Sequence, residues 1–121
     1  LRFATETAIF GMPELNLGLI PAAGGTQSVP RATGITQGVQ ILFSNQTINA
    51  KTAFECGLLT RITKETQLDK LVKTEALKLA SLDQVVVYAA KEALSKGSDM
   101  TAIQGLDLEA RLAEKIIRNK L

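Results

Sequence analysis

The first half of the chain alternates between short hydrophobic runs and polar breaks. Residues 1–4 and 8–10 are mainly apolar and flank a polar triplet, which predicts two strands joined by a tight turn. A further strand is predicted over residues 58–62, after a short helix over 50–56 for which Asn49 is a suitable N-cap. This order of short strands and small helices favours an α/β fold.

Two more short helices are predicted from the spacing of apolar residues, over 26–33 and 35–43. Gly34 separates them, because glycine commonly breaks a helix. Pro30 falls inside the first helix and is expected near its first turn, where a missing N–H is tolerated.

The second half has the three- and four-residue spacing of amphipathic helices, around Leu71 and again around Ala89. Residues 96–99 are expected to close one helix and cap the next. Tyr88 is expected in the core rather than in a catalytic role. In the last helix, one apolar face is formed by Ile103, Leu106, Ala110, Ala113 and Ile117, and a second flank by Leu108, Leu112 and Ile116. This helix is therefore expected to need neighbours on two sides.

Residues 11–26, GMPELNLGLIPAAGGT, follow neither pattern. Their density of glycine and proline excludes a long helix and predicts sharply turning backbone. A loop of this length in a compact domain is usually functional.

The amino-acid composition excludes several kinds of catalytic and metal-binding site. The chain has 121 residues, 45% hydrophobic and 21% charged, which is typical of at most one ordinary globular domain. There is no His and a single Cys, so a Ser-His-Asp relay, a Cys/His zinc site and an internal disulfide are excluded, and no metal site is predicted. Cys56 is expected to pack as a small hydrophobic residue.

The charge balance indicates the kind of partner. Fourteen Lys and Arg against twelve Asp and Glu give a net charge of +2, and the basic residues are scattered among the acidic ones. Neither nucleic acid nor a membrane is therefore the expected partner, and a small molecule or a protein fits better. The apolar runs are also too short to span a bilayer.

Glu14 is the strongest candidate for chemistry, because it lies between Pro13 and a run of apolar residues. Apolar surroundings disfavour a charged carboxylate, which suits proton exchange with water or a carbon acid. The alternative is an ordinary loop carboxylate exposed to solvent. Similarly, Gly24-Gly25 leads into a helix whose N-terminus could hold an anion, a carbonyl oxygen or a water, but a simple tight turn explains the glycines equally well.

The segment FGMPELNLGLIPAAGGTQ, residues 10–27, closely resembles the crotonase (enoyl-CoA hydratase/isomerase) superfamily. The resemblance continues through residues 30–34 and 45–58 and into the helical tail at 91–93 and 105–109, so it covers essentially the whole chain. The tail is most similar to the mitochondrial branch that includes methylglutaconyl-CoA hydratase.

The resemblance implies a fold and an assembly. Residues 1–63 would form the C-terminal part of a spiral of ββα units, and residues 64–121 an incomplete helical trimerisation region. The full-length protein would be a homotrimer or a dimer of trimers in the mitochondrial matrix. Its substrate would be an acyl-CoA thioester, and no cofactor is implied because coenzyme A is part of the substrate.

The resemblance also implies roles for individual residues. Glu14 matches the second of two family glutamates, the one that passes a proton between water and the substrate α-carbon. The substrate- or water-binding positions are Met12, Pro13, Leu17 and Ala22, the last through its backbone N–H, and the loop-shaping positions are Gly11, Gly18, Pro21, Gly24 and Gly25.

Some family features are changed or missing. Ala22 stands where the family usually has Gly, which adds a methyl group and disfavours a positive φ, and Ser28 stands where Arg is common. The first glutamate, both oxyanion-hole donors and the main CoA-binding segments are expected before Leu1, and a final helix after Leu121. Loss of a single oxyanion donor typically costs roughly 100- to 1,000-fold in rate, so this C-terminal part is expected to be inactive alone.

Three functions remain open at this point. The first is hydration of a 2-enoyl-CoA by syn addition of water, in fatty-acid or branched-chain amino-acid catabolism. The second is an enoyl-CoA delta-isomerase of the same fold, which needs only one carboxylate base. The third is a non-catalytic truncated isoform that acts only through subunit contacts.

Overall fold

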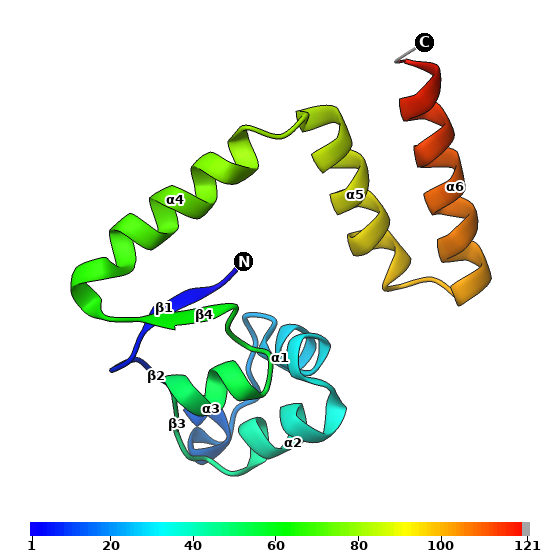
Figure 1. Ribbon diagram of the computed structural model, residues 1–121. Coiled ribbons are helices and arrows are strands. Elements are labelled where there is room, and N and C mark those ends of the chain that lie inside the picture. Colours follow the sequence, from blue (N-terminus) through cyan, green and yellow to red (C-terminus); the bar gives the residue numbers. More distant parts are fainter. Residues whose placement is uncertain (120–121) are drawn as a thin grey trace. The chain divides into compact units, whose positions relative to one another are not determined.

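The computed structural model describes residues 1–119 (Figure 1). The chain divides into two compact units, Leu1–Val72 and the residues from Lys73 onward. The division falls inside a helix, α4 (Leu68–Ala80). The resemblance predicted a different boundary, between the ββα spiral (residues 1–63) and the trimerisation region (residues 64–121). That boundary separates roles and not compact units, and it stays a prediction.

The strands of the first unit form two small sheets. β1 (Phe3–Thr5) pairs in parallel with β4 (Arg61–Thr63), and β2 (Ile9–Phe10) pairs in antiparallel fashion with β3 (Ile48–Asn49). The predicted pairing of the first two strands through a tight turn is therefore wrong, although a turn does join them. Hydrophobic alternation identifies a strand but not its partner, and both partners here lie about 40 to 60 residues away in sequence.

Three alanines and a leucine form the buried cluster of this unit. Ala4, Ala50, Ala53 and Leu59 are buried together, and the partly buried residues around them are Ala8, Phe10, Ile48, Leu58 and Ile62. The two alanines at 50 and 53 lie on α3 (Ala50–Glu55). Asn49 caps this helix as predicted, since its side-chain oxygen accepts a hydrogen bond of 2.9 Å from the N–H of Thr52.

Two helices follow the glycine-rich loop, α1 (Gly25–Thr33) and α2 (Ile35–Phe43). Gly34 ends α1 with a φ of 82°, and its N–H donates to the carbonyl of Pro30 at 2.9 Å. Pro30 is the sixth residue of α1, so the expectation that it lies near the first turn is wrong. It lies close to Gly38 of α2, where an added Cβ would come within 2.8 Å of the Pro30 Cα.

The second unit contains α5 (Gln84–Gly97) and α6 (Ala102–Arg118), which lie side by side (Figure 1). A short 3-10 helix, η2 (Glu65–Gln67), lies between β4 and α4 in the chain. α6 begins at Thr101, whose side chain and that of Gln104 form a reciprocal capping box. The cap is thus two residues beyond the predicted stretch 96–99.

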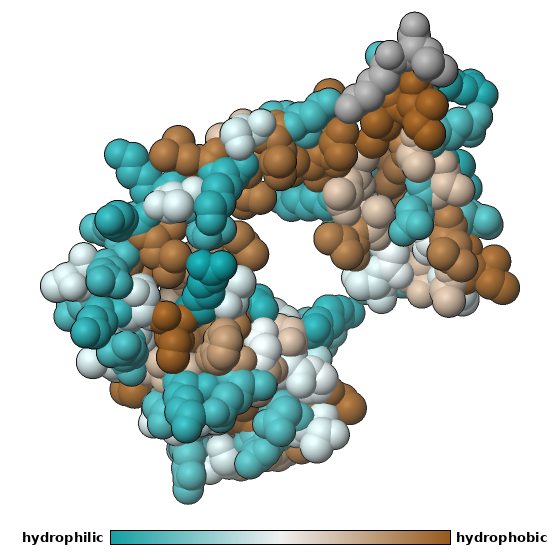
Figure 2. Space-filling model, viewed as in Figure 1, coloured by the Kyte–Doolittle hydropathy of each residue, from teal (hydrophilic) through white to brown (hydrophobic). Residues whose placement is uncertain are grey.

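The two apolar faces of α6 have different environments. Leu108 is buried and Leu112 and Ile116 are partly buried, so the predicted second flank is the one that packs. On the other face, Ile103 and Leu106 are 74% and 65% exposed. Figure 2 shows such hydrophobic residues at the surface of the helical segment.

The expected burial of Tyr88 is also wrong, because this residue on α5 is 71% exposed. The period of an amphipathic helix places residues on faces but does not say which face a neighbour covers. Cys56 is half-buried, and its thiol lies 3.4 Å from the carbonyl oxygen of Ala53.

Candidate active site

The loop between β2 and α1 contains a short 3-10 helix, η1 (Pro13–Leu17), which carries Glu14. Pro13 is suited to the first position of such a helix, because its φ is already helical and no N–H is needed there. η1 ends at Gly18, whose φ is 70° and whose N–H donates to the carbonyl of Leu15 at 3.1 Å. The N–H of Leu19 donates to the Glu14 carbonyl at 3.0 Å, so both ends of the turn are fixed.

The side chain of Glu14 is half-buried, and its Oε2 atom is buried without a hydrogen-bond partner among the described residues. A buried polar atom without a partner is unfavourable for folding, and native structures contain few of them. A carboxylate oxygen in this position is available to a ligand, a water or another protein segment. The picture of a fully solvated loop carboxylate does not fit this burial. The apolar neighbours that were expected to keep the surroundings dry are not the cause, because Leu17, Leu19 and Ile20 are 60–71% exposed.

The second part of the site is the turn that leads into α1. Pro21 is buried, whereas Ala22 and Ala23 are exposed, and Gly24 precedes the helix with a φ of 91°. No side chain caps α1; the Gly24 carbonyl accepts from the N–H of Ser28 at 2.8 Å. The N-terminal end of this helix therefore presents backbone donors and a partial positive charge.

Alanine at position 22 fits this turn. Asn45 is the one non-glycine residue with a positive φ in the part of the chain that the structure describes. Ala22 therefore has an ordinary backbone conformation, and the residue is exposed. The substitution leaves the Ala22 N–H present and introduces no backbone strain.

Three predicted site residues lie in direct contact. An added Cβ on Gly25 would lie 2.9 Å from Cβ of Pro21, 3.0 Å from Cε of Met12 and 3.1 Å from its Sδ. The segment that carries Glu14 and the turn that carries Ala22 therefore meet at the first residue of α1. Gly11 lies close to another part of the unit, with a would-be Cβ 3.1 Å from Cγ2 of Thr47.

The remaining predicted site residues do not join this contact. Leu17 is 71% exposed, and added Cβ atoms on Gly18 and Gly24 would meet no other atom within 4 Å. Both glycines have positive φ, so their role is to turn the backbone.

A cavity of about 460 Å³ lies beside Met12 and is large enough for part of a small ligand. Its lining is mainly apolar, from Ile9, Phe10, Gly11, Met12, Val29, Ile41, Leu58 and Leu59, with Arg2 and Ser28 as its polar side chains. Glu14 does not line it. A second depression of about 280 Å³ includes Met12 and Pro13 and extends to residues 45–47.

Sequence reasoning did not identify Arg2 as a residue that lines the larger cavity. The parallel pairing of β1 and β4 brings it there: its backbone N–H donates to Oγ1 of Thr60 at 3.0 Å, and its Nε donates to the carbonyl of Leu58. Contacts across 56 to 58 residues leave no local signal in a sequence.

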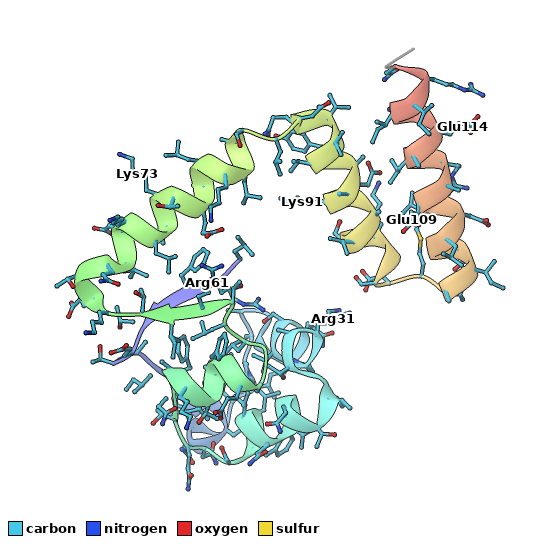
Figure 3. The ribbon with its side chains drawn as sticks, viewed as in Figure 1. Arg31, Arg61, Lys73, Lys91, Glu109 and Glu114 are labelled. Carbon is cyan, nitrogen blue, oxygen red and sulfur yellow. The ribbon has the colours of Figure 1, made fainter. Side chains whose placement is uncertain are left out.

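Several other charged side chains form hydrogen bonds or ion pairs within a single helix. Arg31, labelled in Figure 3, donates to Oε1 of Gln27 at 2.8 Å on the same helix α1. Arg31 therefore donates to polar groups of its own helix. Among residues 1–119, no three Cys, Asp or Glu side chains gather as a possible metal site, and no helix combines the length and apolar character needed to cross a bilayer.

The family model for enoyl-CoA hydratase/isomerase matches residues 1–120. The chain belongs to this family. It is 34% identical over 112 residues to the short-chain-enoyl-CoA hydratase of Clostridioides difficile, an alignment that covers 93% of this chain and 72% of that protein. It is also 34% identical over 109 residues to a Dictyostelium discoideum protein named "Probable enoyl-CoA hydratase, mitochondrial", covering 90% of this chain and 39% of that one.

The fold is that of the crotonase family as well. The crystal structure of an enoyl-CoA hydratase from Bacillus anthracis superposes with a TM-score of 0.94 at 34% identity, covering 98% of this chain and 46% of that one. The chain spans less than half the length of most of the curated relatives it matches. The family and the α/β fold predicted from the sequence are thus confirmed.

Proposed function

We propose that this chain provides one part of a 2-enoyl-CoA hydratase site, in which Glu14 is the catalytic acid–base. The observation that carries the proposal is the buried Oε2 of Glu14, which has no hydrogen-bond partner among the described residues. In the hydration, the oxygen of water bonds to the substrate β-carbon and a proton bonds to the α-carbon. Glu14 would pass that proton between water and the α-carbon, which requires a carboxylate whose oxygen is not already bonded within the protein.

The turn beside Glu14 would hold the reacting water. Ala22 offers a backbone N–H on an exposed turn, and the uncapped N-terminal end of α1 adds a favourable field for a lone pair or a developing negative charge. Met12 and Pro13, which border the 280 Å³ depression, would contact the acyl group, and Leu17 would cover it from its exposed position on η1.

The substrate class of the proposal is a short-chain 2-enoyl-CoA. The name of the Clostridioides relative supports it, and the mainly apolar 460 Å³ cavity is suited to a short acyl chain. No separate cofactor is needed, because coenzyme A is part of the thioester. The polypeptide that contains this chain would supply the oxyanion hole and first glutamate from other residues, and this chain alone would have little activity.

The assembly and location belong to the same proposal. The exposed face of α6, with Ile103 and Leu106, is suited to contacts between subunits of a homotrimer or a dimer of trimers. The proposed location is the mitochondrial matrix; the name of the Dictyostelium relative supports the organelle.

A direct test joins the full 121-residue chain to the part of the Bacillus anthracis hydratase that it does not cover; we call this fusion the grafted hydratase. In crotonyl-CoA hydration, Glu14→Gln should lower kcat by roughly 100- to 10,000-fold, the range typical of a lost general acid–base. Glu6→Gln is the matched control, because Glu6 is an exposed carboxylate in the turn after β1 and should leave kcat unchanged. Full turnover by Glu14→Gln would refute the role of Glu14.

The isomerase alternative has a separate test. The relatives include proteins named for both hydratase and isomerase activity. The coding sequence upstream of Leu1 decides between them: a second glutamate near the glycines of an oxyanion hole supports the hydratase, and its absence supports an isomerase with Glu14 as its single base.

A further inference from the structure

Gly24 and Gly25 are adjacent, but each position requires a glycine for a different reason. Gly24 has a φ of 91°, and a side chain there would meet no atom within 4 Å, so its requirement is the backbone conformation. Gly25 has no positive φ and is buried, and an added Cβ would come within 3.1 Å of three atoms. Position 25 therefore requires a glycine for space.

The three atoms belong to the two segments that carry the proposed catalytic groups. Cε and Sδ of Met12 belong to the residue two positions before Glu14, and Cβ of Pro21 belongs to the residue directly before Ala22. Met12 is half-buried and Pro21 is buried, so neither segment is loosely held at this point. A single residue thus contacts both segments.

We propose that Gly25 is a positioning residue for the hydration: by lacking a side chain, it sets the distance between the Glu14 segment and the Ala22 turn. This inference rests on the proposed function. The Met12 side chain is flexible and can move away from an added methyl group, but the ring of Pro21 is rigid and carries the adjoining backbone with it. An added methyl group therefore moves the Ala22 N–H relative to Glu14.

The position of the two groups matters because one water must contact both. A displacement of about 1 Å between catalytic groups can cost on the order of 100-fold in rate. Binding of the thioester depends mostly on other contacts, so the effect should fall on kcat rather than on KM.

The test uses the grafted hydratase with crotonyl-CoA. Gly25→Ala should lower kcat by about 10- to 100-fold with KM within a factor of about three, since only the geometry of the reacting groups changes. Gly97→Ala is the matched control, because the same added methyl group meets open space on α5 and should change neither value. A Gly25→Ala enzyme with kcat within twofold of the unchanged enzyme would overturn the proposal.

A second variant separates positioning from loss of folding. Met12→Ala removes both atoms that the new methyl group would meet on that side and leaves it room to be accommodated away from Pro21, so Gly25→Ala with Met12→Ala should recover part of the lost kcat relative to Met12→Ala alone. If Gly25→Ala prevents folding, the same double variant should restore a cooperative melting transition. Strictly additive effects of the two substitutions, on kcat or on melting, would contradict the proposed contact.

The experiments distinguish failure of the proposed hydratase function from failure of the role proposed for Gly25. If Glu14→Gln retains full turnover, or the grafted hydratase is inactive although folded, the hydratase role and the catalytic part of this inference are both wrong. If Glu14→Gln is inactive but Gly25→Ala is fully active, the hydratase role stands and the role of Gly25 is wrong.

Discussion

Glu92 of α5 lies one helical turn before Lys96, and its Oε1 is 2.6 Å from Lys96 Nζ. The hydrogen bond from Lys96, and next its positive charge, hold the pKa of Glu92 below its ordinary value of about 4.5, with a smaller contribution from the charge of Lys115. A lowered pKa means that the folded chain stabilises the ionised carboxylate. This stabilisation is present above the ordinary pKa and is lost as the pH falls through the lowered one.

Removing the partner should reverse the shift. Lys96→Met is expected to raise the pKa of Glu92 toward its ordinary value, and carbon-13 NMR of the carboxyl group during a pH titration measures it. Lys51→Met is the control, because Lys51 pairs with Glu55 at 3.8 Å in the other unit. If the Glu92 pKa stays equally low in Lys96→Met, the ion pair is not its cause.

Individual residues were predictable where the cause was local. Asn49 as an N-cap and Gly34 as a helix break follow from residue type and position alone. The partial burial of Glu14 and the lack of a partner for its Oε2 have no such local cause, because its neighbours Leu17, Leu19 and Ile20 are themselves exposed. The exposure of Tyr88 depends on which helix lies beside α5 and on which side. The residues near Tyr88 in sequence do not indicate either.

At the scale of elements, the helices were predictable and the pairing of strands was not. The bounds of α2 coincide with the predicted range, and α1 begins one residue earlier than predicted. By contrast, β1 and β2 each contain two or three residues and pair with strands far along the chain. A helix forms its hydrogen bonds within one segment, whereas a strand needs a partner that the local pattern does not contain.

The contact between α1 and α2 gives a prediction about stability. An added Cβ on Gly38 would lie 2.8 Å from Cα and Cβ of Pro30 and 3.2 Å from its nitrogen, so backbone atoms and not a flexible side chain would have to move. Gly38→Ala should therefore destabilise the grafted hydratase by about 1–3 kcal/mol, the usual cost of overpacking.

Urea unfolding measures this effect as a shift of the midpoint without a change of slope. Gly97→Ala again serves as the control, since the added methyl group meets no atom within 4 Å on α5. An unchanged midpoint in Gly38→Ala would show that the two helices do not approach as closely as described.

At the scale of the whole molecule, the chain has much apolar surface and a small core. Three of the seven buried hydrophobic residues of the first unit are alanines, and no large side chain among residues 1–119 is fully buried. Large hydrophobic residues such as Ile20, Leu94 and Ile103 are exposed by 70% or more. Each 100 Å² of such surface left in water forgoes roughly 2.5 kcal/mol of stabilisation, so the two units are individually poor in the main driving force of folding.

The isolated 121-residue chain is therefore expected to unfold in a broad, weakly cooperative transition and to bind a hydrophobic dye such as ANS. The grafted hydratase should instead melt in one steep transition with little dye binding, because the added polypeptide covers the apolar surfaces. Scanning calorimetry and dye fluorescence on both proteins at equal concentration make the comparison. A steep transition of the isolated chain, with equal calorimetric and van't Hoff enthalpies and no dye binding, would contradict this expectation. It would favour the alternative in which the chain is a stable, non-catalytic subunit that acts through contacts with other proteins.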